Sequence, residues 1–267
     1  MSIQMKNLEF SYSDEKTLNG LSAHLKKGEF ISILGPNGTG KSTLIKCING
    51  LLKPQKGCLS INGCDISGMK HREIAKIMSY VPQSSSSLFN LSVLDMVLLG
   101  RCSHASWRSG KKDCLKAIEA LEYLNIESLA MRSFNELSGG QQQKVVIARA
   151  LAQETEIIVL DEPISNLDIR HQIEVMEIIR ELVDKKAITA ICIVHDLNIA
   201  SRYSDKVVIM NKGQAVAEGK PADVLTKEVI GEVYGVEVGM THVDDGLYIY
   251  PLKVKSLKKE RSYNEKY

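Results

Sequence analysis

A glycine-rich loop between a strand-like run and a helix-like run constrains this chain more than any other feature. The loop follows the apolar run 30–34 and precedes the apolar periodic segment 44–48. It consists of Gly35, Pro36, Asn37, Gly38, Thr39, Gly40, Lys41, Ser42 and Thr43. Glycines let successive backbone N–H groups surround phosphate oxygens, and a helix start adds a positive dipole end. This spacing predicts a nucleoside triphosphate site, with Lys41 on the β- and γ-phosphates and the Ser42 hydroxyl on Mg²⁺.

The alternative is a glycine-rich turn that holds no ligand. The match at every motif position, in the strand–loop–helix setting that the motif requires, argues against it. Residues 35–43 are called the phosphate loop below.

Composition narrows the class of protein. With 267 residues the chain can form one large or two small domains, and its net charge of +2 does not favour a broad nucleic-acid-binding surface. No apolar run approaches the roughly 18 residues of a membrane span, and the first residues lack a signal-peptide core. We therefore expect a protein that is not itself embedded in a membrane. The six cysteines are scattered without a C-x-x-C pair, which favours reduced thiols over disulfides or a zinc site.

Strand-like and helix-like segments alternate along the chain, as in α/β proteins. Expected strands lie at residues 3–10, 23–25, 30–34, 59–63, 79–83, 157–160, 189–194 and 206–210. Expected helices lie at residues 44–48, 74–78, 93–99, 111–124, 141–153, 170–183 and 197–203. The continuous apolar run 157–160 is typical of a strand buried in a parallel sheet. We predict a doubly wound sheet with an inserted helical subdomain.

Two carboxylates follow that apolar run directly. Strand ends of this kind lie beside the phosphate loop in open α/β sheets, so Asp161 is expected to hold Mg²⁺, directly or through water. Glu162 is expected near the γ-phosphate, where it can orient and polarise an attacking water. Paired acids at a strand end are otherwise often solvated, and Lys41 in the same chain favours the catalytic interpretation.

A second glycine-containing helix start lies at residues 137–141, called the signature segment below. Its members are Leu137, Ser138, Gly139, Gly140 and Gln141. Backbone N–H groups at such a helix start can hold an anion, although helix capping by Ser138 is an alternative. The chain has one lysine-bearing loop, so a second phosphate-binding helix start is most easily explained if it caps the γ-phosphate held by a neighbouring copy.

The signature segment and its distance from Asp161 resemble those of ATP-binding-cassette (ABC) ATPases, and the resemblance runs from about residue 3 to 238. It implies a P-loop NTPase core of the RecA-like kind, with an N-terminal antiparallel β subdomain and an inserted α-helical subdomain. We expect one domain over 1–250, with the core at 1–87 and 157–250, the helical subdomain at 88–156, and a basic flexible tail at 251–267. The family also implies a head-to-tail dimer with two ATP molecules between the copies.

Further residues match the family pattern one by one. Tyr12 resembles the aromatic residue that stacks on adenine, and Gln83 the glutamine that joins the Mg²⁺ and water shell to the helical subdomain. Asp168 ends a loop, 165–168, that resembles the segment communicating across the dimer; Ile164 before it stands where Thr is commoner. His195 resembles the switch histidine on the γ-phosphate. The alternatives are a strand-end tyrosine, a solvated glutamine and a structural histidine.

Two segments narrow the branch of the family. Residues 166–172, and residues 99–101 with His104, resemble the importers of ferric siderophores, haem and cobalamin. That branch implies a separate permease dimer, an extracytoplasmic substrate-binding protein, and a location at the cytoplasmic face of the membrane. Residues 84–108 would form the groove that receives a cytoplasmic helix of the permease. Closure of the two copies would push on the permease through the Gln83 region, and phosphate release would reopen them.

Other functions stay open at this point. One is another importer, for zinc, manganese or an amino acid, and another is the cassette of an exporter. A third is a non-transport ATPase acting on DNA or ribosomes, but such proteins usually carry a coiled-coil insertion or two fused cassettes. This chain has one phosphate loop and no heptad run. A binding module that never hydrolyses ATP is disfavoured by Glu162 and His195.

Overall fold

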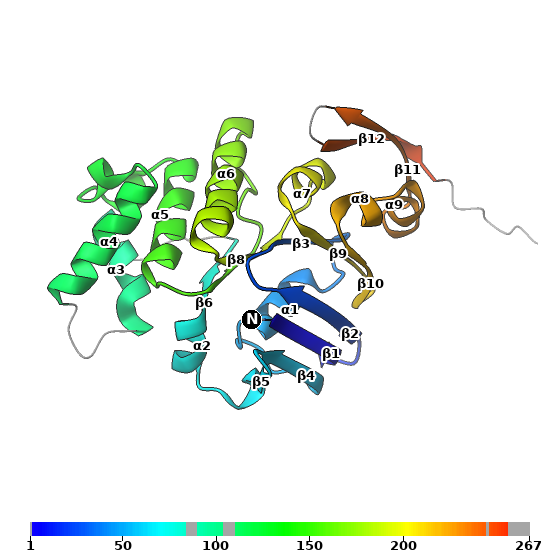
Figure 1. Ribbon diagram of the computed structural model, residues 1–267, viewed down its shortest axis with the longest axis horizontal. Coiled ribbons are helices and arrows are strands. Elements are labelled where there is room, and N and C mark those ends of the chain that lie inside the picture. Colours follow the sequence, from blue (N-terminus) through cyan, green and yellow to red (C-terminus); the bar gives the residue numbers. More distant parts are fainter. Residues whose placement is uncertain (1, 84–89, 104–109, 244–245, 256–267) are drawn as a thin grey trace, which may run out of the picture.

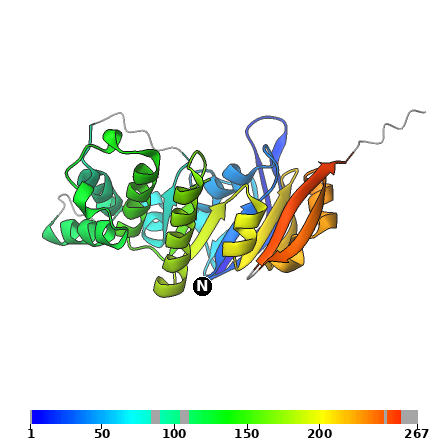
Figure 2. The same cartoon turned by 90° about the horizontal axis from the view of Figure 1, so that it is seen from above.

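The computed structural model describes residues 2–83, 90–103, 110–243 and 246–255. These residues form two larger sheets, a helical lobe and a C-terminal hairpin, as Figures 1 and 2 show. No helix among them has the length and apolar character needed to cross a bilayer. The six cysteines are free thiols.

The larger sheet positions the phosphate loop and both carboxylates. In the described residues its six strands run in the order β10-β9-β3-β8-β7-β6. They are β3 (Phe30–Leu34), β6 (Met78–Val81), β7 (Ile157–Leu160), β8 (Thr189–Ile193), β9 (Lys206–Asn211) and β10 (Gln214–Gly219). Every neighbouring pair is parallel except β9 and β10. The residues of β3, β7 and β8 are all buried, and their carboxyl ends meet at one edge of the sheet.

A smaller antiparallel sheet, in the order β2-β1-β4-β5, is the N-terminal β subdomain. Its strands are β1 (Ser2–Ser11), β2 (Lys16–Lys26), β4 (Lys56–Ile61) and β5 (Cys64–Asp65). β2 is much longer than the predicted 23–25, because it pairs with β1 from Ser2↔Lys26 to Ser11↔Lys16. Helix α1 (Lys41–Ile48) packs between the two sheets, where Ile45 and Ile48 share one core with both.

The opposite face of the larger sheet is covered by α6 (Ile169–Lys186) and α7 (Leu197–Tyr203), so the sheet has helices on both faces as predicted. α6 is longer than the predicted helix at 170–183. It ends where Ala187 takes the left-handed conformation, with φ of 52°. The short helices α2 (His71–Ile77), α8 (Pro221–Val224) and α9 (Lys227–Val233) complete the core.

The helical lobe lies at one end of the molecule in both views (Figures 1 and 2). It contains α3 (Val93–Leu98), the 3₁₀ turn η2 (Leu99–Ser103), α4 (Lys111–Tyr123) and α5 (Gly139–Ala152). α5 begins two residues before the predicted start, because Ser138 caps it and both signature glycines become helical. The predicted inserted helical subdomain is therefore confirmed.

A C-terminal hairpin of β11 (Val236–Val243) and β12 (Gly246–Val254) follows α9. The predicted domain end at residue 250 falls inside β12, since Val254 still pairs with Val236. Asn198 on α7 fixes this strand by donating to the carbonyl of Ile249 at 3.1 Å and accepting from its N–H at 2.7 Å. The rest of the predicted tail, residues 256–267, lies outside the described residues.

Candidate active site

The phosphate loop leaves the carboxyl end of β3 and ends at the first turn of α1, so the predicted strand–loop–helix arrangement is confirmed. At two of its positions both the positive φ and the lack of room for a Cβ atom require glycine. At Gly35, with φ of 145°, a Cβ would lie 2.3 Å from the carbonyl oxygen of Met210. At Gly40, with φ of 94°, it would lie 2.6 Å from the carbonyl oxygen of Thr17. Any side chain at either position would push the loop away from the sheets that support it.

Lys41 is buried within the phosphate loop. Its side chain is 5% exposed, and Nζ donates to the carbonyl oxygens of Gly35 at 2.8 Å and Pro36 at 2.9 Å. Burial lowers the pKa of Lys41, and the charges of Glu162 and Asp161 oppose that effect. The ammonium therefore lies in the field of both carboxylates, inside a loop whose shape suits phosphate.

Asp161 joins the phosphate loop to two neighbouring strands. It is 4% exposed; Ser42 Oγ donates to its Oδ1 at 3.2 Å, and the Tyr80 hydroxyl donates to its Oδ2 at 3.3 Å. Burial raises the pKa of Asp161 despite those two hydrogen bonds. A carboxylate that is poorly compensated in this way is stabilised by a nearby cation.

Tyr80 is a site residue that the sequence interpretation missed. Burial, with the adjacent Asp161 charge, raises the pKa of Tyr80 to about 12, so its hydroxyl stays protonated and can donate. Its position could have indicated this role, because Tyr80 lies one residue before the end of β6, the parallel neighbour of β7.

Glu162 lies between two other predicted residues. Its Oε2 accepts from Gln83 Nε2 at 2.7 Å, and its Oε1 lies 2.7 Å from His195 Nε2. Gln83 follows β6 and His195 follows β8, so the strands on either side of β7 deliver them. Glu162 has a φ of 52°, the left-handed region that non-glycine residues rarely adopt.

The oxygen donors of Ser42 and Asp161 fit Mg²⁺ better than a softer metal. In the described part of the chain no cluster of three or more His, Cys, Asp or Glu side chains could hold a metal alone. Mg²⁺ at this position would take its other ligands from phosphate oxygens and water, which is how that ion is usually bound.

Tyr12 lies at the start of the β1–β2 turn and is 63% exposed. Its ring meets the ring of Phe10 edge-on, with centroids 4.9 Å apart, so it is braced while remaining open to solvent. The same hairpin borders the phosphate loop, because Thr17 of β2 contacts Gly40. An exposed, braced ring beside a phosphate site can offer a stacking surface to a base.

The signature segment caps α5. Gln141 N–H donates to Ser138 Oγ at 3.4 Å, and Ser138 N–H donates to Gln141 Oε1 at 3.1 Å, a reciprocal capping box. The capping alternative is thus present, and Ser138 and Gly139 at this helix start are exposed. α5 belongs to the helical lobe, whereas α1 lies between the sheets of the core (Figure 1).

The signature segment also lies against the N-terminal end of α6. Asp168 caps α6 by accepting from the N–H of His171 at 2.9 Å, and it holds His171 Nδ1 at 2.8 Å. The His171 backbone N–H, followed by its ring, lowers the pKa of Asp168. The ring then lies so close to Gly140 that a Cβ there would be 2.3 Å from Cδ2. Sequence reasoning left His171 without a role, and no spacing rule would have found this contact.

The chain matches a family model described as ABC transporter over residues 18–165. Among curated proteins it is similar to the petrobactin import ATP-binding protein of Bacillus subtilis, with 34% identity over 243 residues, 91% of this chain and 96% of that protein.

Solved structures give the same picture. One described as an inward-facing, metal-chelate type ABC transporter is 31% identical, with a TM-score of 0.83, covering 95% of this chain and 97% of that one. A dimeric ATP-binding cassette in a post-hydrolysis state, bound to ADP and phosphate, is 30% identical, with a TM-score of 0.73, covering 82% and 98%.

Proposed function

Because the chain belongs to the ABC transporter family as an ATP-binding ATPase, we propose that its site hydrolyses Mg²⁺-bound ATP to drive import of a metal chelate through a separate permease. The substrate class we favour is a ferric siderophore, with haem or cobalamin as related candidates. The names of the petrobactin import protein and the metal-chelate type transporter support that class.

The roles proposed for the residues follow from their contacts. Lys41 and the loop N–H groups bind the β- and γ-phosphates, and Tyr12 stacks on the adenine. Ser42 and Asp161 hold Mg²⁺, with Gln83 joining its water shell. A Mg²⁺ ion held there would supply positive charge to offset the charge that develops on the phosphate oxygens. Glu162 orients the attacking water and accepts its proton, and His195 donates to the γ-phosphate.

The observation that carries this proposal is the position of Glu162, held by Gln83 at 2.7 Å and by His195 at 2.7 Å, one residue after the buried Asp161. A general base must reach the water that it activates. Gln83 and His195 could exchange their hydrogen bonds to Glu162 for hydrogen bonds to water and to phosphate. The glutamine and the histidine thus link the acid to the nucleotide.

We propose that the site is completed by a second copy of this chain, arranged head to tail. The signature segment starts a helix in the lobe away from α1, and Ser138 and Gly139 at that start are exposed. A helix start of this kind suits an anion. Its residues Ser138 to Gln141 would cap the γ-phosphate held by the partner's phosphate loop, with Asp168 nearby. The dimeric relative bound to ADP and phosphate supports this arrangement.

The permease is proposed to dock in a groove of about 420 Å³ between the core and the helical lobe. Its core wall includes Leu51, Ala75 and Tyr80, and its lobe wall includes Leu99 and Arg149. Leu51 is 53% exposed and Leu99 is 48% exposed, so both walls of the groove offer apolar side chains to solvent. Such a groove suits the apolar face of an amphipathic helix.

This location overlaps the predicted groove segment, residues 84–108. Among the described residues of that segment, Leu99 and Gly100 line the groove. Residues 84–89 and 104–109, His104 included, lie outside the described residues. Docking there would hold the chain at the cytoplasmic face of the membrane, with an extracytoplasmic binding protein delivering the chelate to the permease.

Uptake in cells lacking this subunit tests the proposal. Cells would be supplied separately with labelled ferric siderophores, haem and cobalamin, and complemented with the wild-type chain or with Glu162→Gln. Uptake of one metal chelate restored by the wild type alone is the expected result. Unchanged uptake of all three in the deletion strain would refute the chelate class.

A further inference from the structure

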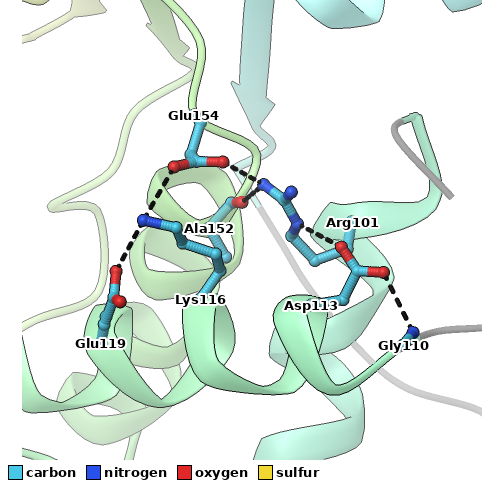
Figure 3. A network of polar contacts seen from close by, with 7 residues as sticks. All are labelled: Arg101, Gly110, Asp113, Lys116, Glu119, Ala152 and Glu154. Atoms are coloured by element: carbon cyan, nitrogen blue, oxygen red, sulfur yellow. Dashed lines mark hydrogen bonds and ion pairs between the residues drawn. The ribbon is translucent and has the colours of Figure 1, made fainter.

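Arg101 of η2 is buried in the helical lobe, 4% exposed, and its guanidinium donates to three acceptors (Figure 3). Nε donates to Asp113 Oδ1 at 3.0 Å, and NH1 donates to Glu154 Oε2 at 2.8 Å and to the carbonyl oxygen of Ala152 at 2.6 Å. A buried arginine is tolerated only with such compensation. The Ala152 contact places its positive charge at the C-terminal end of α5, where the helix dipole favours it.

Glu154 has a second cation on its other oxygen. Lys116 Nζ lies 3.2 Å from Glu154 Oε1 and 2.9 Å from Glu119 Oε2 (Figure 3). Burial opposes ionisation of Glu154, but the hydrogen bonds from Lys116 and Arg101 outweigh it and hold the pKa of Glu154 below its ordinary value. The carboxylate therefore stays charged and fixed to the helical lobe.

The adjacent residue, Gln153, binds the other side of the molecule. Its Nε2 donates to the carbonyl oxygens of Ala75 at 2.5 Å and Met78 at 3.1 Å, on α2 and β6 of the core. The side chain of Gln153 thus contacts the core, whereas the side chain of Glu154 contacts the helical lobe. Residues 153 and 154 are called the crossing below, because the chain passes here from the lobe to the core. Glu154 has a φ of 53°, a left-handed turn at this crossing.

This crossing lies at the end of the helix that carries the signature segment. α5 has 14 residues, so it is about 21 Å long, and a tilt of about 5° at its C-terminal end moves its start by roughly 2 Å. Hydrogen bonds to phosphate tolerate only a few tenths of an ångström, and a misplacement of about 1 Å can cost on the order of 100-fold in rate. The orientation of α5 at Ala152 therefore decides whether the signature N–H groups reach their target.

η2 also connects this crossing to the groove. Leu99 and Gly100 line the groove wall, and a Cβ on Gly100 would lie 2.1 Å from the carbonyl oxygen of Arg149 on α5. The wall, the last turn of α5 and Glu154 are thus fixed to one another by Gly100 packing and by the Arg101 network.

We propose that Arg101 is a positioning residue for the shared ATP site: it fixes α5 to the groove wall so that the signature segment is presented at the correct angle to the partner copy. This rests on the proposed head-to-tail dimer. It predicts that loosening the network impairs closure of the dimer while nucleotide binding to a single copy is unaffected, because the phosphate loop lies in the core.

The test uses the full chain carrying Glu162→Gln as the parent, which is expected to dimerise with ATP and Mg²⁺. Arg101→Lys keeps the charge but loses the planar fork, and Glu154→Gln removes one acceptor charge with little change of shape. Glu119→Gln is the matched control, since it also removes a partner of Lys116 but leaves Arg101 untouched. Sedimentation measures the ATP concentration for half dimerisation, and a fluorescent nucleotide measures affinity at protein concentrations where the chain is monomeric.

The expected result is a rise of about 10-fold or more in the ATP needed for dimerisation by Arg101→Lys and Glu154→Gln, with nucleotide affinity within twofold of the parent and Glu119→Gln unchanged. Shifts under twofold in both variants would overturn the inference. So would a parallel loss of nucleotide affinity and melting temperature, the result of a merely structural role. A parent that stays monomeric with ATP would instead refute the shared site itself.

Discussion

His195 Nε2 lies 2.7 Å from Glu162 Oε1. With Gln83 on the other oxygen of Glu162, both oxygens of the carboxylate are occupied by residues that follow the strands on either side of β7. A carboxylate oxygen can accept more than one hydrogen bond, so these contacts leave room for a water on Glu162. We propose that loosening of either contact, when Gln83 and His195 turn toward Mg²⁺ and the γ-phosphate, makes Glu162 more available as a base.

Glu162→Gln is expected to lower the rate of ATP hydrolysis by about 10²–10⁴-fold, the usual contribution of a general base, because an amide keeps the shape but accepts no proton. Nucleotide binding should persist, so ATP should accumulate in a stable dimer. Steady-state phosphate release and sedimentation with ATP and Mg²⁺ measure the two effects. A variant that stays monomeric while the wild type dimerises would show that Glu162 has another role.

Asp161→Asn is expected to stabilise the nucleotide-free chain while abolishing Mg²⁺-dependent hydrolysis. Burial raises the pKa of Asp161, so its ionised form destabilises the folded state wherever the pH is above the folded pKa. The variant should therefore have a higher melting temperature than the wild type at pH 7, measured without nucleotide.

The pH dependence of that gain follows from the same shift. Below the unfolded pKa, about 4 for Asp, the carboxyl is protonated in both states and the penalty disappears. The difference in melting temperature between variant and wild type should shrink as the pH falls toward that value. A difference that grows on acidification would contradict the assigned effect of burial.

Gly140→Ala is expected to block dimer closure, because its Cβ would lie 2.3 Å from the His171 ring and force the ring or the start of α5 to move. The double variant Gly140→Ala/His171→Ala should recover part of the ATP-dependent dimer, since it removes the obstructing ring. Both are measured by sedimentation in the Glu162→Gln background. No difference between the single and double variants would mean that the ring contact does not set the helix start.

Leu51→Asp is expected to prevent docking of the permease without changing basal ATP hydrolysis, because Leu51 lines the groove away from the phosphate loop. The matched control is Val216→Asp on β10, where an apolar side chain is similarly exposed, 47% against 53%. Co-purification of the permease from native membranes checks the effect. Equal recovery with both variants would place docking elsewhere.

Motif-bearing residues could be predicted because chemistry fixes their spacing. The phosphate loop, Asp161 and Glu162 lie at strand ends that apolar runs reveal, and the alternation of runs was enough for the α/β core and the helical insert. Contacts set by three-dimensional packing could not be found in the same way. Tyr80 reaches Asp161 from a neighbouring strand, and His171 reaches Gly140 across two helices.

The C-terminal hairpin shows the same limit. β12 is held by pairing with β11 and by Asn198, 51 residues away in the sequence, so a local pattern gives little sign of it. The basic composition beyond residue 250 suggested a tail, yet the strand continues to Val254.

The most direct test of the shared ATP site is complementation between two inactive variants. Lys41→Ala removes the phosphate-binding lysine, and Ser138→Arg obstructs the signature segment, so neither variant alone should hydrolyse ATP. In a mixed dimer one site combines both defects, while the other joins an intact phosphate loop to an intact signature segment. We predict that mixing the two purified variants restores ATP hydrolysis, from one site in each mixed dimer. A mixture as inactive as its components, under conditions where mixed dimers form, would contradict the account.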